Sequence, residues 1–152
     1  MADTSAAAEH LALALTQAGM QRMSARVWAA VLCSEQESVT AGELAERLGV
    51  SAGAVSGALK SLLAAGYIVR VPAPGSRRAH YAFPENAWVR LMSQRNNHLR
   101  EMRDAAQEGI TAAGQESIAG RRLAEARDFF DYLLREVPVL LERWQQERSA
   151  GR

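Results

Sequence analysis

A stretch in the middle of the chain has the apolar spacing of a helix but carries almost no bulk or charge. Residues 49–62 read GVSAGAVSGALKSL, which contains three glycines, three serines and one charged side chain, that of Lys60. A glycine inside a helix costs about 1 kcal/mol relative to alanine. Small side chains allow close approach of a backbone, while hydroxyl and ammonium groups bind phosphate oxygens or base edges. These residue types therefore suit contact with a polyanion.

The apolar spacing assigns two faces to this helix, which we expect over residues 51–65. Val55, Leu59, Leu62 and Leu63 form a buried stripe. The opposite face carries the candidate DNA-binding residues Ser51, Gly53, Ala54, Ser56, Gly57, Lys60 and Ser61. A helix that lies in the major groove of DNA needs a face without bulk or negative charge. Tight packing against another protein element would use the same small residues and is the alternative.

Capping signals predict a helix-turn-helix that ends in this helix. Thr40 and Glu43 form an S/T-x-x-E capping box, and Gly49 ends the helix that begins there. Ser51 is an N-cap residue for the next helix, which Gly66 ends. Two short helices around a glycine-containing turn are typical of a helix-turn-helix.

The residues after the helix-turn-helix predict a β-hairpin wing. YIVRV (67–71) and AHYAF (79–83) are strand candidates, and PAPGSRR (72–78) is a turn between them. The turn places Arg77 and Arg78 at an exposed tip, where arginine suits the narrow, electronegative minor groove of DNA. A solvated turn with two idle cations is the alternative.

The distribution of charge agrees with a local polyanion contact. The net charge is +1, but Val50–Pro84 contains no Asp or Glu and carries four cations, while the other residues hold 14 cations and 17 anions. A small basic region on a slightly acidic body favours binding of nucleic acid. Arg22 and Arg26 lie one helical turn apart upstream, and either ion pairs or contacts with the DNA backbone would suit them.

The sequence offers no residues for catalysis or for a cofactor. It has no phosphate loop, no G-x-S-x-G and no paired histidines. His10, His80 and His98 are scattered, so we expect no metal site, and His80 is a candidate phosphate contact. Cys33 is the one cysteine; we expect a buried inert thiol, with oxidant sensing as the alternative. We expect no enzyme and no cofactor.

The remaining residues predict helices at both ends of the chain. Upstream, we expect helices over 5–18 and 20–34. Downstream, Leu123, Phe130, Val137 and Trp144 recur at the seven-residue spacing of a coiled coil. Gly109 and Gly114 predict an interhelical turn there, and Pro138 predicts a break near Glu136.

The chain length and the terminal residues indicate how many domains the protein has and where in the cell we expect it. A chain of 152 residues fits one domain with helical extensions. No apolar run approaches the length of a membrane span, and the N-terminal residues lack the basic segment of a signal peptide. The preference for arginine over lysine, together with many alanines, favours a GC-rich bacterial genome. We expect a cytoplasmic protein without a membrane partner.

The helix-turn-helix and wing motifs together resemble those of a known protein family. TAGELAERLGVSAGAVSGALKSLLAAGYIVRVPAPGSRRAHYAF resembles the winged helix-turn-helix of MarR-type transcriptional regulators. GMQRMSARVWAAVL through HYAFPENAW, and later RLAEARDFFDYLLREVPVLLERW, are similar to the GbsR-like branch. The resemblance implies a mainly α fold with a small β-hairpin wing. It also implies an N-terminal dimerisation helix (1–19), a winged helix-turn-helix (20–84) and a C-terminal helical dimerisation region (85–152).

The resemblance further implies a homodimer whose two wings straddle a pseudo-palindromic operator, and a repressor rather than an activator. Ser51, Gly53, Ala54, Ser56, Gly57 and Lys60 would lie on the recognition helix, and Arg77 and Arg78 at the wing tip. The Asp–Arg pair of a typical MarR wing is absent, so its bracing ion pair is not expected. Aromatic residues such as Trp28, Trp88 and Trp144 could line the pocket of a small-molecule effector, with core and dimer packing as the alternative.

Two other functions are compatible with the same elements. A winged-helix protein-interaction module without DNA binding would have its small-residue face covered by a protein partner. A helical dimer with an RNA-directed wing would prefer RNA to duplex DNA.

Overall fold

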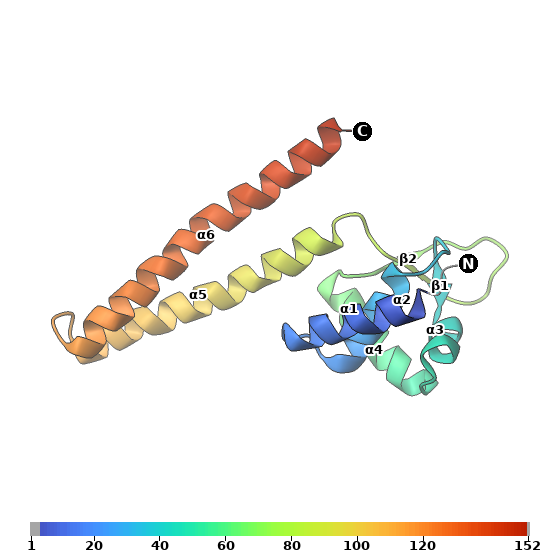
Figure 1. Ribbon diagram of the computed structural model, residues 1–152, viewed down its shortest axis with the longest axis horizontal. Coiled ribbons are helices and arrows are strands. Elements are labelled where there is room, and N and C mark those ends of the chain that lie inside the picture. The colour runs from blue at the N-terminus through green and yellow to red at the C-terminus, as the bar shows by residue number, and fades with distance from the viewer. Residues whose placement is uncertain (1–3, 152) are drawn as a thin grey trace. The chain divides into compact units, whose positions relative to one another are not determined.

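The elements fold in the order that the motifs predict. The computed structural model describes residues 4–151, and contacts divide the chain into an N-terminal unit that ends at Arg90 and a C-terminal unit that begins at Leu91. The elements, labelled in Figure 1, are α1 (Ser5–Gln17), α2 (Arg22–Leu32), β1 (Val39–Thr40), α3 (Ala41–Leu48), α4 (Ala52–Ala65), β2 (Val69–Val71), β3 (His80–Ala82), α5 (Ala87–Ala113) and α6 (Ile118–Ala150). The predicted fold class, mainly α with a small β-hairpin wing, is confirmed.

The ends of α3 and α4 follow their capping residues. The Thr40 hydroxyl accepts a hydrogen bond from the Glu43 backbone N–H, and the Glu43 carboxylate accepts one from the Thr40 N–H at 2.7 Å. Ser51 caps α4 by accepting from the Ala54 N–H. Gly49 and Gly66 end the two helices in the left-handed region, with φ of 63° and 73°, where a side chain would strain the backbone. The predicted helix-turn-helix is therefore present, with a bend of 119° between its helices.

The predicted wing gains a third strand. β2 and β3 pair antiparallel, with Val71 opposite His80, and β1 pairs with the other edge of β3, with Thr40 opposite His80. The strand order is β1-β3-β2. β1 was not predicted, because two residues are too few to show the alternation that identifies a strand.

Helix α2 carries the centre of the N-terminal unit. It packs against α1, α3 and α4, and its Trp28 is fully buried. The Trp28 ring lies 5.3 Å from the Tyr67 ring, 5.5 Å from Phe83 and 4.9 Å from Trp88. Its indole N–H donates to the Tyr67 carbonyl at 2.9 Å. Trp28 thus fixes the start of the sheet and the first turn of α5 to the helix-turn-helix.

The structure shows what Arg26 contacts. Its guanidinium donates to both Glu9 carboxylate oxygens, at 3.0 and 3.1 Å from Nε, and to the Leu48 carbonyl at 3.3 Å. These hydrogen bonds lower the pKa of Glu9 below its usual value. Arg26 therefore joins α1, α2 and the last turn of α3. Of the two roles expected for Arg26, an ion pair and a contact with the DNA backbone, the structure shows the ion pair.

The C-terminal unit is a pair of long helices joined by a turn (Figure 1). Gly114 makes the turn with φ of 82°, and Ser117 caps α6. Close to the turn the helices touch, because a Cβ on Gly109 would lie only 2.7 Å from Leu123 Cδ1. Farther along, Arg103 lies 3.5 Å from Asp131. Gly114 is thus in the predicted turn, while Gly109 lies inside α5 and permits close packing.

The predicted break near Glu136 is wrong, because α6 runs through Pro138 without interruption. A proline inside a helix removes one backbone hydrogen bond. Ending the helix there would require new caps at both ends of the gap. The flanking sequence, REVPVLLERW, offers neither a glycine to end one helix nor a Ser, Thr, Asp or Asn to start the next. The continuous helix avoids the need for those caps.

Among residues 4–151, none of the helices is by itself long and apolar enough to cross a membrane. Only α3 and α4 together reach such a composition, and they do so across their bend.

The capping box makes stability depend on pH through Glu43. Hydrogen bonds from the Thr40 backbone N–H and hydroxyl lower the pKa of Glu43 below its usual 4.5. A lowered pKa in the folded state stabilises the fold above pH 4.5, and this stabilisation is lost as the pH falls through the folded pKa. We expect Glu43→Gln to lower the free energy of unfolding by about 0.5–1 kcal/mol at pH 7. The difference from wild type should shrink below pH 4.5 in chemical denaturation.

The control for this prediction is Glu46→Gln, at an exposed position on the same helix. A Glu43→Gln difference that stays constant from pH 7 to about pH 3.5 would contradict a role for the ionised carboxylate in the cap.

Candidate nucleic-acid interface

Helix α4 is held by one face and open on the other. Val55, Leu59 and Leu62 are 0%, 3% and 2% exposed, and Ala58 is also buried. Leu63, the fourth predicted member of the stripe, is half-buried. The stripe packs against α2 and α3. Anchoring by this stripe leaves the other face without any role in the core.

The predicted contact residues of α4 lie at the surface. Ala54 is half-buried, and the exposed ones are Ser51, Gly53, Ser56, Gly57, Lys60 and Ser61. A Cβ built on Gly53 or Gly57 would meet nothing within 4 Å. The glycines therefore do not serve packing against any described part of this chain. If the small residues of α4 serve tight packing against protein rather than DNA, the packing partner must be another molecule.

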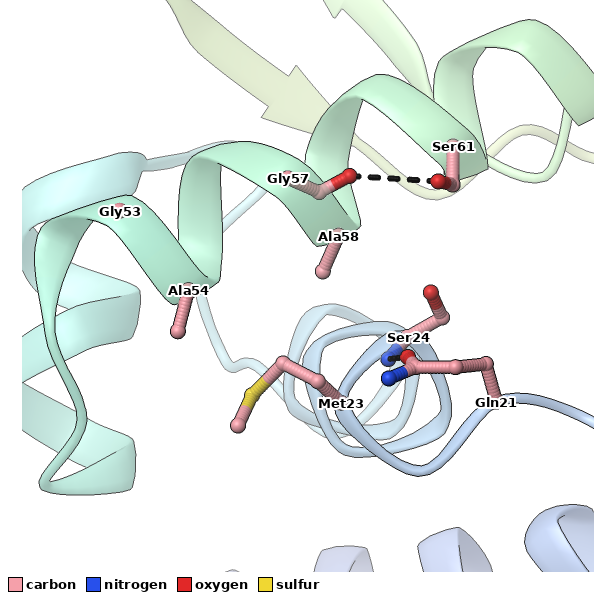
Figure 2. A pocket seen from close by; sticks show the side chains of 8 residues that line it. All are labelled: Gln21, Met23, Ser24, Gly53, Ala54, Gly57, Ala58 and Ser61. Carbon is pink, nitrogen blue, oxygen red and sulfur yellow. Dashed lines mark hydrogen bonds between the residues drawn. The ribbon is translucent and has the colours of Figure 1, made fainter.

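A groove runs between α4 and the start of α2. Its volume is about 420 Å³ and its lining consists of Gln21, Met23, Ser24, Gly53, Ala54, Gly57, Ala58 and Ser61. Figure 2 shows Ala54 and Ala58 pointing toward α2, so Ala54 forms a wall of the groove. The Gln21 side chain caps α2 by accepting from the Ser24 N–H at 2.8 Å. The wall that α2 contributes to the groove could not be predicted, because glutamine is an unusual N-cap residue and the two helices meet only in the folded chain.

The wing turn exposes both of its arginines and places one of them, Arg78, near α3. Gly75 turns the chain with φ of 83°, and the Ser76 N–H donates to the Ala73 carbonyl at 3.0 Å. Arg77 and Arg78 are both exposed. Arg78 reaches toward the start of α3, where a Cβ on Gly42 would lie 3.9 Å from its Nη1. The folded wing therefore holds Arg78 beside the helix-turn-helix.

A second recess brings another cation to α4. Its volume is about 330 Å³ and its lining consists of Ala41, Ser56, Leu59, Lys60, Leu63, Arg70 and Tyr81. The Arg70 guanidinium carbon lies 5.8 Å from the centre of the Tyr81 ring, close enough for a cation–π contact. Two cations and a serine hydroxyl around one recess suit a phosphate group. Arg70 lies in the stretch without Asp or Glu, Val50–Pro84. Its short strand does not predict that Arg70 lies beside Tyr81 and Lys60.

The remaining candidates do not form a reactive cluster. Cys33 is a half-buried free thiol. Within the described part of the chain, no group of three or more His, Cys, Asp or Glu residues could hold a metal ion. His80 lies with both ring nitrogens 3.1 Å from serine hydroxyls, Nδ1 from Ser38 and Nε2 from Ser76.

This arrangement of helices and wing agrees with comparisons to known proteins. A MarR family model matches residues 18–79, and a model of MmpR5-like MarR family transcriptional regulators matches residues 86–147. The HTH-type transcriptional regulator MmpR5 of Mycobacterium tuberculosis is 30% identical over 128 residues, which are 84% of this chain and 78% of that protein. The chain belongs to the MarR family of transcriptional regulators.

One solved structure supports the same fold for this MarR-family chain. A crystal structure of a transcriptional regulator is similar with a TM-score of 0.74 and 28% identity, over 91% of this chain and 95% of that one. Similarity to the crystal structure of an Escherichia coli MarR mutant with operator DNA is lower, with a TM-score of 0.44 and 18% identity over 88% and 87% of the two chains. The structural comparison therefore depends on the first of these.

The open face of α4 makes a prediction about stability. Because Gly57 lies inside a helix and has free space around it, Gly57→Ala should raise the free energy of unfolding by about 0.5–1 kcal/mol. Thermal or chemical denaturation of the free protein measures the change. The matched control is Gly120→Ala in α6, whose Cβ would overlap the Gly114 carbonyl oxygen, so that variant should be destabilised. A loss of stability in Gly57→Ala would mean that this face is packed.

Proposed function

We propose that this MarR-family protein is a sequence-specific regulator of transcription that binds double-stranded DNA as a homodimer. The observation that carries the proposal is the open, acid-free face of α4, which has cationic side chains beside it. α4 would enter the major groove, which is about 12 Å wide. Gly53 and Gly57 would let its backbone approach the bases closely. Ser51, Ser56 and Ser61 would contact base edges or phosphates, and Lys60 would neutralise a phosphate. Ala54, which points toward α2 and lines the groove, would add no bulk to this side of the helix.

The wing would bind beside the recognition helix. Arg77 and Arg78 carry charges at an exposed tip, and a narrow minor groove attracts arginine. Because α4 has few long side chains, much of the discrimination between sequences would come from the wing and from DNA shape. Arg70, across the recess from Lys60, would add a phosphate contact.

The proposal of a homodimer is supported by the apolar side chains of α6. Phe129, Tyr132, Val139, Leu140 and Trp144 are 50–60% exposed. So many large exposed apolar side chains on one helix are typical of a surface that another chain covers. A second copy would bury them, with residues 1–19 and 85–152 forming the dimerisation regions on either side of the winged segment 20–84. The dimer would then read a pseudo-palindromic operator, one half-site for each wing.

Further parts of the proposal concern regulation. A dimer that covers an operator would act as a repressor in the bacterial cytoplasm. A small-molecule effector would act by changing the distance between the recognition helices, which must match the ~34–36 Å of one DNA turn. The GbsR-like branch stays a prediction, since the matched model over residues 86–147 describes the MmpR5-like group.

Selection of bound duplexes from a genomic library tests DNA recognition. We expect an inverted repeat among the selected sequences, and affinity that falls with salt at a log–log slope near −0.9 for each phosphate contact. Arg78→Ala should reduce discrimination between selected and random duplexes more than Ser56→Ala does. Loss of the Arg78 contact should reduce the affinity for a selected duplex about ten-fold. The reverse ranking would contradict the role of the wing.

Two outcomes of the same selection would favour the competing functions. Absence of salt-dependent duplex binding would favour a protein-interaction module. Preference for RNA in direct competition would favour an RNA-directed wing.

The dimer has its own test on α6. Leu140 is 60% exposed in the single chain, and burial of a leucine contributes about 1.5–3 kcal/mol. Leu140→Glu should therefore weaken dimerisation at least ten-fold in sedimentation equilibrium. Gln146→Glu introduces the same charge at an exposed polar position of this helix and is the control. Equal dimerisation of the two variants would exclude this face from the interface.

A further inference from the structure

His80 connects the wing to a distant part of the chain. Its Nδ1 lies 3.1 Å from the hydroxyl of Ser38, which is 42 positions away and directly precedes β1. Its Nε2 lies 3.1 Å from the hydroxyl of Ser76, in the wing turn. The ring itself is half-buried at the start of β3. One imidazole therefore joins the wing tip to the segment that leads into the helix-turn-helix.

Ser76 passes this connection on to the wing tip. Its hydroxyl accepts a hydrogen bond from the Arg78 backbone N–H at 3.2 Å, while its own N–H donates to the Ala73 carbonyl. The last paired residues of the hairpin are Val71 and His80, so residues 72–79 receive no support from the sheet. Since residues 50–84 contain no Asp or Glu, no ion pair within the wing can replace these hydrogen bonds.

The two serine hydroxyls satisfy both ring nitrogens of His80. A neutral imidazole has one donor and one acceptor nitrogen, and a hydroxyl has one donor and two acceptor positions. In either tautomer, one serine donates to the ring and the other accepts from it. Ser76 keeps an acceptor position for the Arg78 N–H in both cases. Both ring nitrogens of His80 and the Arg78 backbone N–H therefore have a partner within the protein.

We propose that Ser38, His80 and Ser76 form a positioning array that holds the wing tip and thereby presents Arg78 to DNA. The inference rests on the proposed function. His80 is a positioning residue: both of its ring nitrogens are engaged by protein hydroxyls, so it acts through Ser76 and not by binding phosphate. An ordered tip loses less conformational freedom when it binds, and its affinity is higher for that reason.

Hydrogen exchange in the free protein tests the array without DNA. Ser76→Ala and His80→Leu should accelerate exchange of the backbone amides of residue 73 and residues 75–80, because both remove the link between the tip and Ser38. His80→Gln keeps one donor and one acceptor and should restore part of the protection. Ser149→Ala, at an exposed serine of α6, is the control. Unchanged exchange in Ser76→Ala would overturn the proposal.

A double-mutant cycle on a selected duplex tests the consequence for binding. Ser76→Ala should weaken binding about three- to ten-fold, the range expected from one lost hydrogen bond, and should have no effect once Arg78 is alanine. An equal loss in the Arg78→Ala background would overturn the role of Ser76 in presenting Arg78. Failure of the wild type to bind any duplex at low ionic strength would contradict the proposed function, whereas the exchange result would still decide whether the array holds the wing.

Discussion

The anchoring of α4 by its buried apolar stripe is the constraint on which the rest of the structure depends. Val55, Leu59 and Leu62 are almost fully buried, and the helix packs against both α2 and α3. Most helical stability in proteins comes from packing of an apolar face rather than from helix propensity. The opposite face is thereby freed from the need for strong helix formers, so it can consist of glycine, alanine and serine and remain open.

Helix α2 makes that anchoring rigid because two residues in its middle, Arg26 and Trp28, contact different neighbours. Trp28 packs against the rings of Tyr67, Phe83 and Trp88, and its indole N–H donates to the Tyr67 carbonyl. Arg26 joins Glu9 of α1 to the Leu48 carbonyl at the end of α3. Helix α4, the wing and α1 are therefore all fixed to α2. His80 extends the same frame outward to the wing turn, where the sheet itself gives no support.

Sequence reasoning succeeded where the interactions are local and failed where they are not. The ends of α3 and α4 were predicted because capping boxes, N-cap serines and left-handed glycines act within a few residues. β1 escaped prediction because its two residues become a strand only when β3 lies beside them. Pro138 is an exception among the local signals: it predicts a helix end, but α6 continues through it because the residues around it provide no new caps. The recess that joins Arg70 to Lys60 exists only once the sheet packs against α4.

The sequence by itself determined helix α4, its buried and open faces, the acid-free region around it and the arginines of the wing turn. These follow from helical spacing, capping and composition, which are properties of contiguous residues. Only the tertiary structure decided that Arg26 pairs with Glu9, that Arg78 reaches the start of α3 and that His80 joins Ser38 to Ser76. The physical reason is that Arg26 and Glu9 lie 17 positions apart, and His80 and Ser38 lie 42 apart. Many cations and hydroxyls could have met before packing selected one arrangement.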